Sequence, residues 1–139
     1  MTFIWYPRCT TCIKAKKWLL ENNVKFDERH IVEKNPSKEE LKTWYKKSGL
    51  ELKKFFNTSG LLYKEMGLKD KLKTMSEDEQ LELLSSNGML VKRPIVIDGD
   101  TVLVGFKEDV WKEKLKYRRD MNQSPMKNSF NFKLILVLR

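Results

Sequence analysis

The sequence is poor in residues that bind transition metals. It contains two cysteines, Cys9 and Cys12, and a single histidine, His30. A structural zinc site needs about four ligands, usually cysteine or histidine side chains. These residues cannot complete such a site unless two subunits share one metal ion, so we expect no metal in this protein.

Long apolar stretches are also missing. No run approaches the roughly 18 residues that span a bilayer, and LILVL near the C-terminus is far too short. The N-terminus, MTFIWYPRC, lacks the charged-then-apolar layout of a signal peptide. We expect a cytoplasmic protein with no membrane partner. In that reducing compartment two cysteines do not imply a structural disulfide.

Positive charge is in excess, with 28 lysines and arginines against 19 acidic residues and a net charge of +9. Such a charge is common in nucleic-acid-binding proteins. Its distribution is not typical of them, because lysines alternate with glutamates in segments such as SKEELKTWYKK, as on solvated helix faces. Residues 118–139 alone hold five basic residues against one aspartate. We therefore expect no direct binding of nucleic acid.

The order of the expected strands and helices indicates one α/β domain. Phe3–Pro7 and Val24–Val32 have the composition of strands, and apolar positions from about Thr11 follow a helical period between them. Ile95–Ile97 and Val102–Val104 flank an Asp-Gly-Asp turn, which predicts a β-hairpin, and a last helix follows it.

A block of helices separates these two halves, at about residues 34–90. Two of its helices begin with a capping box, a serine followed three residues later by glutamate, and each is expected to end at a glycine: Ser37–Gly49 and Ser76–Gly88. The expected order is β-α-β, helical insertion, β-β-α, with a mixed sheet.

Both cysteines lie where a strand gives way to a helix. Backbone N–H groups and the helix dipole stabilise a thiolate at such a helix start, so Cys9 is expected to be the attacking thiolate. Cys12 follows one turn later and could resolve the product to an intramolecular disulfide. Two buried cysteines without redox activity remain the alternative.

Four stretches in combination are specific to a known family: WYPRCTTCIKAKKWL, PSKEELKTWYKKSGLELKKFFNTSG, MSEDEQLELLSSNGMLVKRP and VGFKED. Through them the chain resembles the ArsC/Spx group of thioredoxin-fold proteins, closest to its small arsenate reductase-like bacterial branch. The resemblance implies an α/β thioredoxin-like fold over residues 1–117, with the insertion at 34–90. It leaves 118–139 as a tail expected to add little to the core: an edge strand, a partner-binding segment or translation past the usual stop.

The resemblance also implies roles for individual residues. Cys9 matches the family's reactive cysteine, with Cys12 as the resolving thiol, and Arg93 matches its active-site arginine before Pro94. A cis Arg93–Pro94 bond is expected with the thioredoxin fold. No bound cofactor is implied, because thioredoxin, glutaredoxin or glutathione would supply the electrons. The protein is expected to be a monomer. His30 is expected to be structural and distant from the cysteine pair.

Departures from the family pattern bear on the substrate. Arsenate-reducing members follow the reactive cysteine with Gly-Thr-Ser and bring further arginines to the oxyanion. Here two of those arginine positions correspond to Asn57 and to the neighbourhood of Gly105. Because an arsenate site uses several charge-assisted donors, we expect weak or absent arsenate reduction.

Three functions remain open from the sequence. The first is a thiol–disulfide oxidoreductase that uses the Cys9–Cys12 pair. The alternative is a redox-sensing regulator like Spx, which binds the α subunit of RNA polymerase. This chain shares the Cys-x-x-Cys of those regulators but lacks the arginine that they carry in the insertion, at Asn57–Ser59. The third is a family member with neither activity.

Overall fold

The computed structural model describes residues 1–116, so the expectations for the 118–139 tail lie outside the described residues. Contacts divide the chain into two units. The first comprises residues 1–15 and 26–106, and it contains the sheet and the helical insertion. The second comprises residues 16–25 and, in the described part, 107–116.

Four strands form one mixed sheet in the order β2-β1-β3-β4. They are β1 (Thr2–Trp5), β2 (Asp27–His30), β3 (Ile95–Asp98) and β4 (Thr101–Val104). The first two pair in parallel, and β3 pairs antiparallel with both β1 and β4. The expected hairpin is thus confirmed, with Gly99 in its turn at φ +61°.

The second strand is shorter than the sequence predicts. Instead of Val24–Val32, only Asp27–His30 pairs with β1. Asn23 adopts a left-handed conformation (φ 57°) just after α1 (Thr10–Glu21), and the Val24 N–H bonds to Leu19 O at 3.0 Å. Val24 therefore belongs to the end of the helix rather than to the strand.

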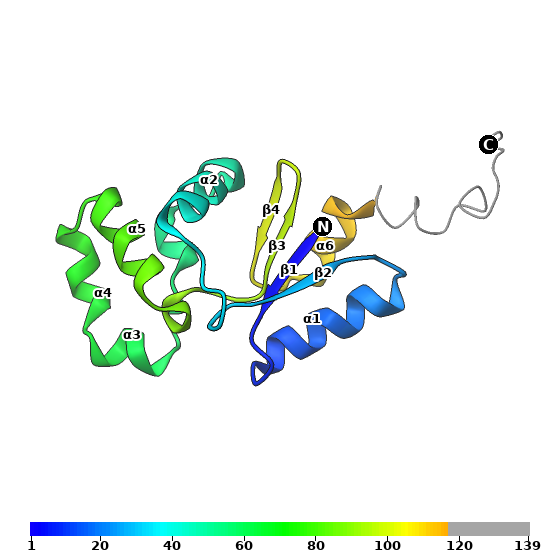
Figure 1. The fold of residues 1–139 in the computed structure, drawn as a ribbon, viewed down its shortest axis with the longest axis horizontal. Coiled ribbons are helices and arrows are strands. Elements are labelled where there is room, and N and C mark those ends of the chain that lie inside the picture. The colour runs from blue at the N-terminus through cyan, green and yellow to red at the C-terminus, as the bar shows by residue number, and fades with distance from the viewer. Residues whose placement is uncertain (117–139) are drawn as a thin grey trace, which may run out of the picture. The chain divides into compact units, whose positions relative to one another are not determined.

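The insertion between β2 and β3 consists of helices, as expected (Figure 1). Its elements are α2 (Lys38–Ser48), η1 (Leu52–Phe55), α3 (Leu61–Glu65), α4 (Leu68–Lys71), η2 (Leu72–Thr74), α5 (Glu77–Ser86) and η3 (Gly88–Leu90). Both capping boxes are confirmed, and so is the left-handed Gly49 after α2.

The expectation that Gly88 ends its helix is wrong. Helix α5 ends at Ser86, and Asn87 follows in an extended conformation and caps η3 with its side chain. Gly88 is required for space instead: a Cβ on it would lie against the carbonyl oxygen of Ile31 and 2.9 Å from the Cα atom of Val32. The backbone of the insertion therefore touches the backbone that follows β2.

One hydrophobic core joins the sheet to the insertion. Helix α2 packs against β4 and against α5. The fully or almost fully buried side chains of this core include Ile4, Ile31, Leu41, Phe55, Phe56, Leu68, Leu84, Leu90, Val91 and Ile95. In the second unit, helix α6 (Glu108–Lys114) places Trp111 edge-on to Trp18 of α1, with ring centroids 6.0 Å apart. Packing alone accounts for these aromatic residues.

Candidate active site

Cys9 lies in the turn between β1 and α1. Its N–H donates to Tyr6 O at 2.9 Å, and its carbonyl accepts the helical bond from Ile13 N at 3.0 Å. The Cys9 Sγ accepts a hydrogen bond from the Cys12 backbone N–H at 3.3 Å. The sulfur therefore occupies the place of an N-cap acceptor, where helix N–H groups stabilise negative charge.

Cys12 is the buried partner of this pair. Its side chain is fully excluded from solvent, whereas Cys9 is half-buried, and both are reduced thiols. The backbone at Tyr6 interacts with the Cys12 thiol and offsets part of the rise in its pKa that burial causes. The two cysteines are thus adjacent, but only Cys9 is open to a molecule arriving from solvent.

The surroundings drive the pKa values of the two thiols apart. At Cys9, partial burial opposes ionisation, but hydrogen bonds from the Cys12 side chain and backbone and the nearby Arg93 outweigh it and lower the pKa below 9.0. Burial, together with the hydrogen bond to Cys9 and the charge on it, raises the pKa of Cys12 to about 12. Cys9 therefore ionises more readily than Cys12.

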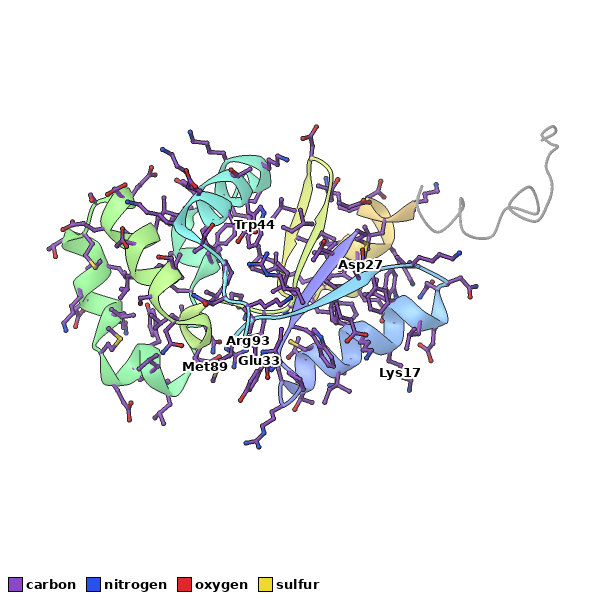
Figure 2. The ribbon with its side chains drawn as sticks, in the orientation of Figure 1. Lys17, Asp27, Glu33, Trp44, Met89 and Arg93 are labelled. Carbon is purple, nitrogen blue, oxygen red and sulfur yellow. The ribbon has the colours of Figure 1, made fainter. Side chains whose placement is uncertain are left out.

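Two contacts hold the side chain of Arg93. After the Cys12 hydrogen bonds, its guanidinium is the next group that lowers the pKa of Cys9. Its Nη1 donates to Met89 O at 3.3 Å, and its Cζ lies 5.2 Å from the centre of the Tyr6 ring. Figure 2 labels Arg93 and Met89 next to each other, between the sheet and the insertion. The Arg93–Pro94 bond is cis, as the resemblance implied.

The insertion positions the segment that carries Arg93. Lys92 N donates to Phe55 O at 2.7 Å, and Asn57 N donates to Leu90 O at 2.8 Å. Between these two bonds, Phe56 and Val91 form an isolated antiparallel bridge. Residues 90–92 are therefore paired with residues 55–57 of the insertion, and the chain leads from them into β3.

The two positions where arginines were expected in arsenate-reducing relatives have structural contacts here. The Asn57 side chain lies against Gly60, where a Cβ would be only 2.5 Å from its Nδ2. Gly105 has φ +78°, and its N–H bonds to Pro94 O at 2.8 Å. Neither residue supplies a cation.

His30 has the structural role expected for it. Its Nδ1 accepts hydrogen bonds from Val32 N and Glu33 N, each at 3.1 Å, and so closes the turn after β2. It is nearer to the site than expected, because its ring meets the Tyr6 ring edge-on at 5.7 Å. Sequence reasoning missed Tyr6 altogether; its place two residues before the Arg8-Cys9 pair, at the end of an aromatic strand, was the signal available.

Two other kinds of site are absent from residues 1–116. No three side chains of histidine, cysteine, aspartate or glutamate lie together in a way that could hold a metal ion. None of the helices described there has the length and hydrophobicity needed to cross a membrane.

The thiol assignments predict unequal alkylation of the two cysteines. Iodoacetamide should modify Cys9 with a pH midpoint below 9.0 and should leave Cys12 almost unmodified, because its pKa is about 12. Mass spectrometry of the intact and digested protein after labelling between pH 5 and 10 measures both rates. Equal rates with unshifted midpoints would contradict the assignment of the two roles.

Three known proteins are similar to this chain over most of its length. YusI of Bacillus subtilis is 65% identical over 113 residues, which is 81% of this chain and 96% of YusI. The global transcriptional regulator Spx of Streptococcus agalactiae is 32% identical over 110 residues, 78% of each chain. The crystal structure of an ArsC family related protein from Bacteroides fragilis is 57% identical, has a TM-score of 0.79, and covers 81% of this chain and 94% of its own.

The expected fold class, α/β and thioredoxin-like with a mixed sheet, is confirmed by these structural neighbours. The model of the ArsC family matches residues 4–114, which include the cysteine pair, the whole insertion and Arg93. From this match and from the 65% identity to YusI, we conclude that the chain belongs to the ArsC family.

Proposed function

We propose that the protein is a thiol–disulfide oxidoreductase in which Cys9 attacks and Cys12 resolves. One observation carries the proposal: two adjacent thiols have opposite environments. Cys9 is half-buried and accepts hydrogen bonds beside Arg93, whereas Cys12 is fully buried. A structural pair of cysteines has no need of this asymmetry, and a nucleophile with a resolving partner does.

The reaction begins with a substrate disulfide. The Cys9 thiolate attacks one of its sulfurs, so a Cys9–substrate S–S bond forms, the substrate S–S bond breaks, and the departing thiolate takes a proton from solvent. Arg93 stabilises the Cys9 thiolate before the attack and can hold an anionic group of the substrate.

Resolution then uses Cys12. Once Cys9 is in the mixed disulfide, its negative charge no longer opposes ionisation of Cys12. The Cys12 thiol loses its proton and attacks the Cys9 sulfur, which forms the Cys9–Cys12 disulfide and releases the second half of the substrate as a thiolate. Two electrons have passed to the substrate. A dithiol protein such as thioredoxin or glutaredoxin, or two molecules of glutathione, then supplies two electrons and reduces the Cys9–Cys12 disulfide to the two thiols.

Trapping of the mixed disulfide tests this proposal. Cys12→Ser removes the resolving thiol, so the full-length variant should accumulate a covalent adduct with a disulfide substrate such as oxidised glutathione. Mass spectrometry should show the adduct on Cys9, and dithiothreitol should release it. The wild-type protein should instead collect as the Cys9–Cys12 disulfide and turn over with a thiol reductant. If neither species forms, the redox proposal is wrong.

The similarity to Spx favours a second candidate, a redox-sensing regulator. In that case the same Cys9–Cys12 disulfide would change the affinity for the RNA polymerase α subunit, and no substrate would be consumed. Binding of purified α subunit to the reduced and the oxidised protein distinguishes the two functions. Redox-dependent binding without turnover supports the regulator, and turnover without binding supports the enzyme.

A further inference from the structure

The geometry of the site converges on Tyr6, a residue that the proposed reaction does not use. Its carbonyl accepts the Cys9 N–H at 2.9 Å, and its backbone is one of the groups that affect the pKa of the Cys12 thiol. Its ring lies 5.2 Å from the Arg93 guanidinium carbon and meets the His30 ring edge-on. Three components of the redox site and one structural histidine therefore meet at a single side chain and its backbone.

The ring contact matters because Arg93 has a long side chain with many rotamers. Its bond to Met89 O, at 3.3 Å, is longer than the usual 2.9–3.0 Å for N–H···O. A guanidinium over an aromatic ring gains cation–π energy and loses rotational freedom. The Tyr6 ring thus restricts the orientations open to the Arg93 guanidinium, which is one of the groups that lower the pKa of Cys9.

The Tyr6 ring also packs against a second neighbour, His30. His30 packs edge-on to Tyr6 at an interplanar angle of 89°. Two backbone N–H groups, of Val32 and Glu33, hold the His30 ring through its Nδ1, and the Glu33 carboxylate lies 3.9 Å from its Nε2. A chain of contacts therefore runs from the turn after β2 through His30 and Tyr6 to Arg93.

We propose that Tyr6 is a positioning residue of the redox site, and that its ring acts on Cys9 through Arg93. The inference rests on the proposed function for its meaning, since the thiolate it supports is the attacking group. It does not rest on turnover for its test, because the reactivity of Cys9 toward an alkylating agent can be measured without any substrate.

The test compares Cys9 alkylation in Tyr6→Leu, Arg93→Ala and the double variant. Tyr6→Leu should slow iodoacetamide labelling of Cys9 at pH 6.5 by about fivefold, the change that about 1 kcal/mol of lost cation–π energy produces. In the Arg93→Ala background, Tyr6→Leu should have no further effect. Tyr6→Phe keeps the aromatic face and should restore most of the wild-type rate.

Two further variants supply a control and a replacement for Tyr6→Leu. Tyr45→Leu is the matched control, because Tyr45 is also half-buried and edge-on to an aromatic ring, that of Phe55, within the insertion; its loss should leave Cys9 labelling unchanged. Tyr6→Met replaces Tyr6→Leu if that variant does not fold, as judged by circular dichroism.

An equal slowing by Tyr6→Leu with and without Arg93 would overturn the inference, and so would an unchanged labelling profile. If the trapping experiment fails while Cys9 labelling still depends on Tyr6 through Arg93, the proposed function is wrong and the inference about Tyr6 stands.

Discussion

Replacing Gly88 with alanine should lower the free energy of unfolding by about 3 kcal/mol, at the upper end of the range for overpacked sites. The new Cβ would meet the Ile31 carbonyl oxygen, 2.8 Å from the Ile31 carbonyl carbon and 2.9 Å from the Val32 Cα atom. These are backbone atoms, so no rotation of a side chain can make room. Either the turn after β2 or the segment leading to Arg93 must move.

Chemical denaturation monitored by tryptophan fluorescence measures this loss. Gly99→Ala is the matched control, because nothing lies within 4 Å of its added Cβ and only its φ of +61° is unfavourable. That control should lose about 1 kcal/mol. Equal losses at the two glycines would show that the close backbone approach at Gly88 is not a constraint.

The same substitution should also disturb the thiol chemistry. Gly88 directly precedes Met89, whose carbonyl holds Arg93, and its neighbour Ile31 directly follows His30. A shift on either side of this contact changes the chain of contacts that reaches Cys9. The stability of the fold and the reactivity of Cys9 are therefore coupled through Gly88, although Gly88 takes no part in the proposed reaction.

Local signals in the sequence predicted the elements of the fold well. The capping boxes at Ser37 and Ser76 form through the same serine and glutamate atoms that the pattern requires. The Asp-Gly-Asp turn also forms the hairpin between β3 and β4. These features depend on residues within four positions of each other, so spacing alone carries the information.

Contacts between distant segments were not predicted, and they define the site. Tyr6 and Arg93 are 87 positions apart, and no local pattern pairs an aromatic residue with an arginine over that separation. Cys9 and Cys12 were found because they are neighbours on one helix start. Arg93 was found only through the family resemblance, and Gly88 was misassigned because its tight backbone contact is with a residue from another segment.

The pairing of Arg29 with Glu40 is another contact that was not predicted from the sequence. The guanidinium binds both carboxylate oxygens at 2.8 Å, donates from Nε to Lys34 O at 2.9 Å, and stacks on the Trp44 ring at 5.7 Å. Edge strand β2 is thereby tied to the start of α2. Glu40 was predicted as part of a capping box, and that bond to Ser37 N also forms, at 3.0 Å.

Neutralising Glu40 should therefore destabilise the protein in a pH-dependent way. The Arg29 hydrogen bonds lower the pKa of Glu40 from 4.5 to about 2. Because the folded pKa lies below the unfolded one, the stabilisation is fully present above about pH 4.5 and is lost as the pH falls toward 2. With the carboxylate 40% exposed and partly screened by solvent, we expect Glu40→Gln to cost about 2 kcal/mol at pH 7.

Glu79→Gln isolates this contribution. Glu79 occupies the same capping-box position in α5 and bonds to Ser76 N at 2.9 Å, but within residues 1–116 it has no arginine partner. Glutamine preserves the capping bond in both variants, so Glu79→Gln should change stability by less than about 0.5 kcal/mol. Urea denaturation between pH 2.5 and 7 should show the wild-type and Glu40→Gln curves converging as Glu40 becomes protonated. Parallel curves would mean that Arg29 contributes through stacking on Trp44 rather than through the carboxylate.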